Sequence, residues 1–180
     1  MNELLSYVFS PLRGGDIALY RGSGNGLAPI LLLAAEETSL GCVERLRHEY
    51  ALKAELDADW AARPVALTRY NGRMTLVLED PGGVPVDRLL GRPLDLSQFL
   101  RIAIPLAGAL RRVHERGLIH KDIKPANILV NEASGGVWLT GFGIASRLPR
   151  EHQAPAPPLV IAGTLAYMAP EQTGRMGGLP

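Results

Sequence analysis

The stretch His120-Lys121-Asp122-Ile123-Lys124-Pro125-Ala126-Asn127 decides how the rest of this chain is interpreted. It has the form H-x-D-x-K-P-x-N, and an apolar strand candidate over residues 128–130 follows at once. This pattern is hard to produce by chance, because it sets five groups at fixed spacings: an imidazole, a carboxylate, an amine, a proline and an amide. The alternative is a polar turn between a helix and a strand, with Pro125 as the breaker.

The bulk composition is that of a globular domain. The chain has 180 residues, which suits one domain, and 47% of them are hydrophobic, enough for a core. The net charge of +1 gives no general attraction to nucleic acid or to a membrane surface. Cys42 is the one cysteine, the first residues lack the features of a signal peptide, and no apolar run has membrane-spanning length. We therefore expect a cytoplasmic protein.

The first 80 residues have the pattern of a small sheet with one helix. Five short segments are predicted as strands: 7–12, 17–21, 29–33, 65–69 and 74–79. The glycine-rich segment 22–26 and Asn71-Gly72 are predicted as hairpin turns. Apolar residues at spacings of three and four predict a helix over 43–56.

A long helix is predicted directly before the stretch 120–127. Asp95 is placed to cap its first turn, with Gln98 as the reciprocal partner, and one apolar face continues to His114. Pro105 should kink this helix or loosen one of its turns, and Gly117 should end it. Residues 128–130 and 137–140 are predicted as a further hairpin.

The opening stretch resembles the catalytic loop of the protein kinases. The resemblance implies that Asp122 is the base for a substrate hydroxyl, Lys124 a cation on the transferring phosphoryl group and Asn127 a Mg²⁺ ligand. It implies a structural role for His120, as a brace of the loop. ATP and Mg²⁺ are the implied cofactors.

The same resemblance gives roles to segments before and after this loop. Residues 12–21, called the flap here, resemble a short glycine-rich flap over the phosphates, with Gly14 and Gly15 as its glycines. Glu79 and Asp80 begin the hinge, whose backbone would face adenine. Four further positions belong to the activation segment: Phe142, Gly143, Thr164 and Glu171. Thr164 is typical of serine/threonine kinases and should lie near Asp122 and Lys124.

Two positions depart from the kinase pattern. Leu33 stands where a strand lysine should hold the phosphates, and Gly141 stands where an aspartate should hold the metal. Glu49 has the position of the glutamate that pairs with that lysine, so we expect it to pair with Arg45 or Lys53 instead.

The expected fold is α+β: a protein-kinase-like two-lobe fold with an antiparallel-sheet N-lobe over residues 1–80 and an incomplete helical C-lobe over residues 81–180, its lower helices missing. The motifs are similar to those of the kinase-like domain at the front of large bacterial signalling proteins. A protein substrate or regulatory partner, and further signalling modules of a larger parent chain, are therefore expected partners; nucleic acid and membrane are not.

Three hypotheses follow from this pattern. The chain is a serine/threonine kinase that is weak or rescued by a substitute cation, a pseudokinase that works as a binding module, or a fragment without autonomous function. The intact loop favours the first, Leu33 and Gly141 favour the second, and the small number of residues after Glu171 favours the third.

Overall fold

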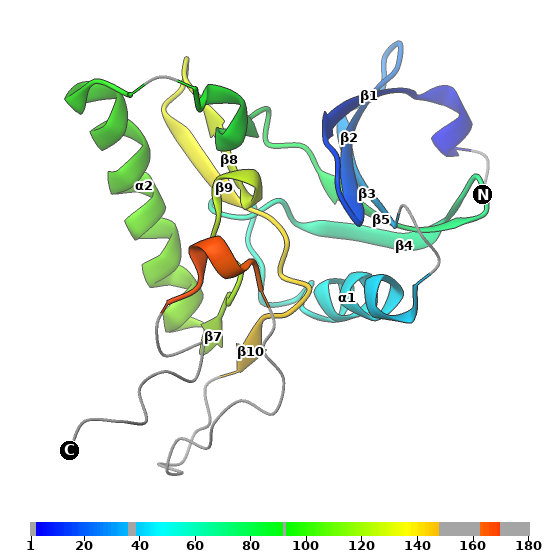
Figure 1. Cartoon of the computed structure of the whole chain (residues 1–180). Helices are drawn as coiled ribbons and strands as arrows, with labels where there is room; N and C mark the ends of the chain where they lie inside the picture. Colours follow the sequence, from blue (N-terminus) through cyan, green and yellow to red (C-terminus); the bar gives the residue numbers. More distant parts are fainter. Residues whose placement is uncertain (1–2, 36–38, 92, 148–162, 170–180) are drawn as a thin grey trace, which may run out of the picture.

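The N-terminal part of the protein is a five-stranded antiparallel sheet with a helix beside it (Figure 1). The structure is a computed structural model that describes residues 3–35, 39–91, 93–147 and 163–169. After a short 3-10 helix, Glu3–Ser6, the strands are β1 (Val8–Arg13), β2 (Ile17–Ser23), β3 (Ile30–Ala35), β4 (Pro64–Tyr70) and β5 (Arg73–Glu79). Their order in the sheet is β1-β2-β3-β5-β4. All five predicted strands and both hairpins are confirmed.

The central strand β3 carries the apolar run that ends at Ala35. Leu31, Leu32 and Leu33 are all buried, because neighbouring strands pair with β3 on both sides. Leu33 lies opposite Leu19 on β2 and Leu76 on β5, so its side chain is part of the sheet's apolar core. Burial of such side chains is the main stabilising contribution to a sheet of this kind.

Helix α1 (Leu40–Ala51) begins and ends earlier than predicted. Ser39 caps it, since the side-chain oxygen accepts from the backbone N–H of Cys42, and this cap lies before the apolar stripe on which the prediction rested. Leu46 and Glu49 are buried on the face of α1 that points into the protein.

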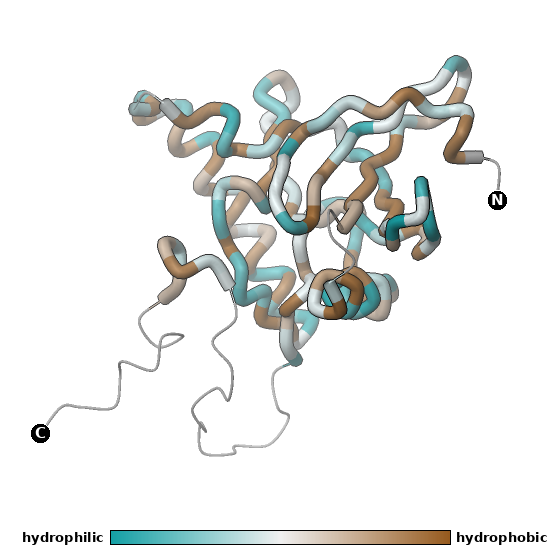
Figure 2. The backbone as a smooth tube through the Cα atoms, turned by 45° about the vertical axis from the view of Figure 1, so that its right-hand side comes forward, coloured by the Kyte–Doolittle hydropathy of each residue, from teal (hydrophilic) through white to brown (hydrophobic). Residues whose placement is uncertain are grey.

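The C-terminal part is built around helix α2 (Leu96–Glu115), which Figure 1 shows on the opposite side of the molecule from the sheet. Its predicted cap is confirmed: Asp95 Oδ1 accepts from Gln98 N at 2.8 Å. Pro105 lies within the helix, which continues past it, and Gly117 follows its end with a φ of 69°. Figure 2 shows hydrophobic and hydrophilic segments in turn along the helices, as expected of helices with one buried face.

Short elements connect α2 to the site. They are β6 (Val84–Pro85), the 3-10 helix η2 (Val86–Leu89), β7 (Leu118–Ile119), the 3-10 helix η3 (Pro125–Asn127), β8 (Ile128–Asn131), β9 (Gly136–Leu139), β10 (Ser146–Arg147) and the 3-10 helix η4 (Leu165–Tyr167). Strands β6, β8 and β9 form one small sheet, and β7 and β10 form another. The predicted α+β, kinase-like two-lobe fold is confirmed.

Two apolar cores meet at β8. One contains α2, Trp60 and Phe142, and the other contains the large sheet and α1. Leu129 of β8 belongs to the second core, while its neighbours Ile128 and Val130 belong to the first. Alternation along this strand therefore joins the two halves of the protein.

Part of α2 has its apolar residues exposed. Leu96, Phe99, Leu100 and Ile104 are between 41% and 71% exposed. Among the described residues, no helix is long and apolar enough to cross a membrane.

Candidate active site

The loop 120–127 begins with a buried, uncharged histidine. His120 is 2% exposed, its Nε2 lies 3.1 Å from Thr140 O, and its Nδ1 accepts from Asp122 N at 3.2 Å. Burial lowers the pKa of His120 to about 4, so the ring is uncharged at neutral pH. The ring also packs on Phe142, with centroids 4.4 Å apart. The bracing role expected for His120 agrees with these contacts.

Asp122 is the centre of the polar cluster above this histidine. Its Oδ1 accepts from Thr164 Oγ1 at 2.8 Å, and its Oδ2 lies 2.9 Å from both Lys124 Nζ and Asn127 Nδ2. Lys124 Nζ also donates to Thr164 Oγ1 at 2.6 Å. Burial alone would raise the pKa of Asp122, but the bonds from Lys124, Thr164 and Asn127 outweigh it and lower that pKa. The carboxylate is therefore ionised and can accept a proton.

The central strand β3 contributes no cation to the upper wall of the site. Leu33 is 1% exposed and contributes only carbon to the wall. Glu49, on α1, is 2% exposed, and its Oε1 accepts from Gly141 N at 3.1 Å. Burial raises the pKa of Glu49 to about 7, although that hydrogen bond and the charge of Arg13 act in the opposite direction.

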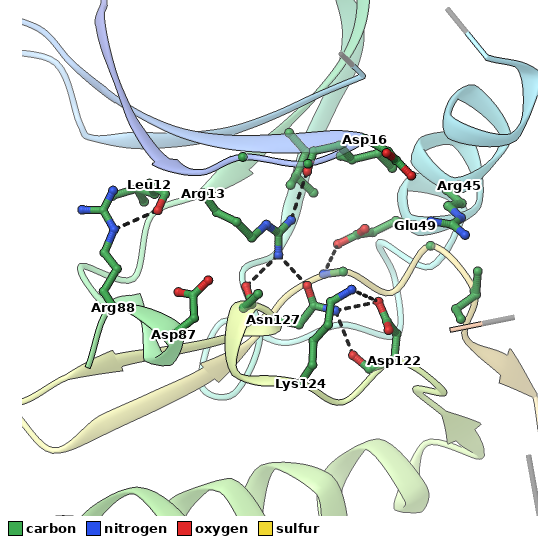
Figure 3. Close-up of a pocket in the computed structure, with 18 residues that line it drawn as sticks. Leu12, Arg13, Asp16, Arg45, Glu49, Asp87, Arg88, Asp122, Lys124 and Asn127 are labelled. Carbon is green, nitrogen blue, oxygen red and sulfur yellow. Dashed lines mark hydrogen bonds and ion pairs between the residues drawn. The ribbon is translucent and has the colours of Figure 1, made fainter. Parts of the chain in front are cut away.

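The pairing expected for Glu49 is wrong. Lys53 Nζ donates to Val65 O instead, at 3.0 Å, and Figure 3 shows no interaction between Glu49 and Arg45. A buried carboxyl group needs a partner that lies inside the protein, and the Gly141 N–H is that partner.

Gly141 has no room for a side chain. Its φ is 81°, and a Cβ there would lie 2.8 Å from the side-chain Cγ and Oδ1 of Asn127. An aspartate at this position would therefore need a different backbone path. Phe142 is completely buried, and Gly143 packs so closely on Arg45 that its Cβ would lie 2.8 Å from the Arg45 Cβ. Glu171, expected in the activation segment, lies outside the described residues.

Arg13 is a site residue that the sequence reasoning missed. Its Nη1 donates to Asn127 Oδ1 at 2.5 Å and to Ala126 O at 2.6 Å, and its Nη2 donates to Ile17 O at 3.4 Å (Figure 3). Burial lowers the pKa of Arg13, while the charges of Glu49, Asp87 and Asp122 act in the opposite direction. The sequence contained a signal for Arg13. When the strand lysine is absent, a basic residue of the flap becomes a candidate for the missing cation.

A second arginine binds the flap from the other side. Arg88, on η2, donates from Nε to Leu12 O at 2.8 Å and from Nη2 to Pro11 O at 2.6 Å. Arg13 and Arg88 thus cross the cleft in opposite directions, one from the flap to the loop and one from the C-terminal part to the flap.

The residues predicted for cofactor binding divide into two groups. Gly14 and Gly15 line a cavity of about 560 Å³ between the flap and the loop, together with Asp122, Lys124 and Asn127. Glu79 and Asp80 are not part of this lining: Asp80 pairs with Arg21 at 2.5 Å, and Glu79 pairs with Arg63.

The described residues do not fit a Mg²⁺ ion. Asn127 Oδ1 is occupied by a guanidinium, and Gly141 leaves no space for the missing carboxylate. Within residues 3–35, 39–91, 93–147 and 163–169, no group of three histidine, cysteine, aspartate or glutamate side chains could hold a metal. Mg²⁺ prefers several oxygen ligands, carboxylates among them, and one amide oxygen is too few.

The fold and this site define a protein-kinase-like chain, and comparison with known proteins gives the same result. The family model for the protein kinase domain matches residues 32–177, so the chain belongs to the protein kinase family. It is similar to a probable serine/threonine-protein kinase from Corynebacterium efficiens, with 37% identity over 121 residues that cover 66% of this chain and 16% of that protein.

Two further relatives have the same kind of name. The serine/threonine-protein kinase PknK from Mycobacterium tuberculosis is 39% identical over 102 residues, which are 56% of this chain and 9% of that protein. A probable serine/threonine-protein kinase PknB from Lactococcus lactis is 28% identical over 167 residues, which are 89% of this chain and 26% of that protein. The chain therefore spans a small part of the relatives it matches.

Proposed function

We propose that this serine/threonine-kinase-like chain is a pseudokinase, a regulatory module whose phosphoryl-transfer machinery is kept in place but is almost inactive. The observation that carries the proposal is the bond from Arg13 to Asn127, which uses the oxygen that a kinase needs for its metal. The loop keeps its shape, because Asp122, Lys124 and Thr164 are bonded to one another. Shape without a metal site suits binding better than catalysis.

The expected loss of rate is large. Phosphoryl transfer depends on positioning and on stabilisation of charge, with little covalent work for the protein. Loss of one preorganised charge-stabilising group costs on the order of 3–4 kcal/mol of barrier. Two independent losses, at Leu33 and Gly141, would remove roughly five powers of ten in rate at about 1.4 kcal/mol per decade.

The test is incorporation of radiolabelled phosphate from ATP with Mg²⁺, into the chain itself and into basic serine- and threonine-containing substrates. We expect no more incorporation by the natural chain than by Asp122→Asn. Asp59→Asn, at an exposed aspartate far from the loop in sequence, is the matched control. Incorporation that Asp122→Asn abolishes and Asp59→Asn keeps would disprove the pseudokinase proposal.

A second function is favoured by one observation. Asp122 is ionised and bonded to Thr164 and Lys124, so the base and its cation are ready for a substrate hydroxyl. A weak serine/threonine kinase would then use Arg13 as the substitute cation on the phosphates. In that case Arg13→Gln should abolish the same incorporation, and Arg69→Gln, at an exposed arginine of β4, should not.

Partners and cofactors of the pseudokinase follow from its class. ATP and Mg²⁺ are the cofactors of kinases generally, and the site supports at most a nucleotide without the metal. A protein partner in a bacterial signalling pathway, and modules in a larger parent chain, are part of this proposal, as is a cytoplasmic location. Capture of the same partner by the natural chain and by Asp122→Asn would support a role that needs no catalysis.

A further inference from the structure

Arg13 reaches the catalytic loop because β1 contains a bulge. In the ladder between β1 and β2, Pro11 pairs with Tyr20 and Arg13 pairs with Leu19, so Leu12 is an extra residue. Regular alternation would send Leu12 and Arg13 to opposite faces of the strand. The bulge turns both inward: Leu12 is buried in the core, and Arg13 points at Asn127.

The bulge also leaves backbone oxygens available for a second contact. Pro11 has no N–H, and the extra residue interrupts the ladder beside it. The Pro11 and Leu12 carbonyls accept both hydrogen bonds from Arg88. One irregularity of the strand thus supplies two of the contacts between the sheet and the C-terminal part of the protein, those of Arg13 and Arg88.

At the other end of the contact, the Asn127 side chain has one atom that could ligate a metal, Oδ1. Its Nδ2 donates to Asp122 O at 2.8 Å and to Asp122 Oδ2 at 2.9 Å, and its Oδ1 accepts from Arg13. An amide nitrogen donates hydrogen bonds and does not ligate metals, so a metal would need the oxygen that Arg13 holds. Arg13 and a divalent metal therefore compete for one atom.

The hydrogen bonds of Arg13 decide this competition. The guanidinium is held by Asn127 Oδ1, Ala126 O and Ile17 O, and its burial, which opposes a charge, is offset in part by the charges of Glu49, Asp87 and Asp122. It is attached to the chain, so it loses little freedom on binding, whereas a metal ion would have to displace it and would then meet a neighbouring positive charge. We propose that the Arg13 guanidinium is the resident cation of this site, takes the place of a divalent metal and closes the flap onto the catalytic loop without any ligand.

This proposal deepens the proposed pseudokinase function, on which it rests for the assignment of the site. The two can fail separately. Phosphoryl transfer that depends on Asp122 but needs no divalent metal would disprove the pseudokinase and leave the role of Arg13 intact. Mn²⁺ bound through Asn127 in a chain without transfer would do the reverse.

The experiment is a titration of the full chain with Mn²⁺, with free Mn²⁺ followed by electron paramagnetic resonance. Three chains are compared: the natural chain, Arg13→Glu and the control Arg69→Glu, which changes an exposed arginine. We expect no Mn²⁺ site that depends on Asn127 in the natural chain or in the control. Arg13→Glu should bind Mn²⁺ about tenfold or more tighter than any binding measured for the natural chain. The reason is that a repelling cation becomes a carboxylate ligand.

A second measurement tests closure. Backbone hydrogen exchange in residues 8–23 should be slow in the natural chain without nucleotide or metal, and faster in Arg13→Gln but not in Arg69→Gln. If Arg13→Glu does not fold, the exchange measurement on Arg13→Gln decides alone. Mn²⁺ binding to the natural chain that Asn127→Ala removes, equal Mn²⁺ affinities with and without Arg13, or unchanged exchange in Arg13→Gln would each overturn the proposal.

Discussion

Replacing Glu49 by glutamine should change how the stability of this protein depends on pH. Glu49 is buried, and burial raises its pKa from 4.5 to about 7. Between these two values the folded state holds one more proton than the unfolded state. Stability therefore falls as pH rises through this window, by roughly 3 kcal/mol in total at about 1.4 kcal/mol per pKa unit.

His120 acts in the opposite direction. Burial lowers its pKa from 6.5 to about 4, so between these values the unfolded state holds the extra proton. Stability contributed by the neutral ring rises with pH through that window, again by roughly 3 kcal/mol. The two windows overlap between the unfolded-state pKa values of 4.5 and 6.5, and there the two slopes cancel.

Glu49→Gln removes one of the two opposing slopes. The amide oxygen can still accept from Gly141 N, so the hydrogen bond is kept while the titration is lost. The variant should gain stability as pH rises from about 4 to about 6.5 and then remain constant. Above pH 7 the free energy of unfolding of the variant should exceed that of the natural chain by up to about 3 kcal/mol. This gain is reduced by the stability that is lost when Arg13 loses its counter-charge.

The assay is urea unfolding at a series of pH values, followed by tryptophan fluorescence. Trp60 is a suitable reporter because it is buried and packs edge-on against Phe142. Glu44→Gln, on the exposed side of the same helix, is the control and should follow the natural chain. If Glu49→Gln and the natural chain have parallel pH profiles, the reasoning about the buried carboxyl group is refuted.

Three stability predictions can be checked by the same unfolding assay. Phe142→Ala should cost about 3–5 kcal/mol, because the ring is completely buried; a cost under about 1 kcal/mol would contradict this. Asp95→Ala should cost about 1 kcal/mol through loss of the α2 cap, and Asp95→Asn should cost little; equal costs would show that the cap is not the cause. Gly141→Ala should cost more stability than Gly117→Ala. Both glycines have a positive φ, but a Cβ at Gly117 meets nothing within 4 Å, whereas a Cβ at Gly141 meets the side chain of Asn127. Equal losses would show that strain alone acts.

Local sequence signals predicted the parts of the fold that depend on near neighbours. The α2 cap needs Asp95 and Gln98, three residues apart, and their contact is present. Strands and hairpins were found because alternation and turn residues are local properties. The start of α1 was missed because Ser39 lies outside the apolar stripe that marked the helix.

Contacts between distant segments were harder to predict. Arg13 and Asn127 are separated by 114 residues, and Glu49 and Gly141 by 92, so no spacing in the sequence points from one to the other. The prediction for Glu49 used its neighbours along the helix, and burial overruled them. Asp122, Lys124 and Asn127 were expected together because they lie within six residues, a property of the sequence itself, and their side chains are in contact.

The extra residue in β1 has a consequence for the descent of such chains. Removal of one residue from this strand would restore regular alternation and move the Arg13 side chain to the face opposite Leu12, with no change of residue type at the loop. Loss of the internal cation by this route requires a deletion, and its recovery requires an insertion. Lineages that keep the arginine should therefore share the length of β1. Lineages in which that length differs should have another source of positive charge in the cleft.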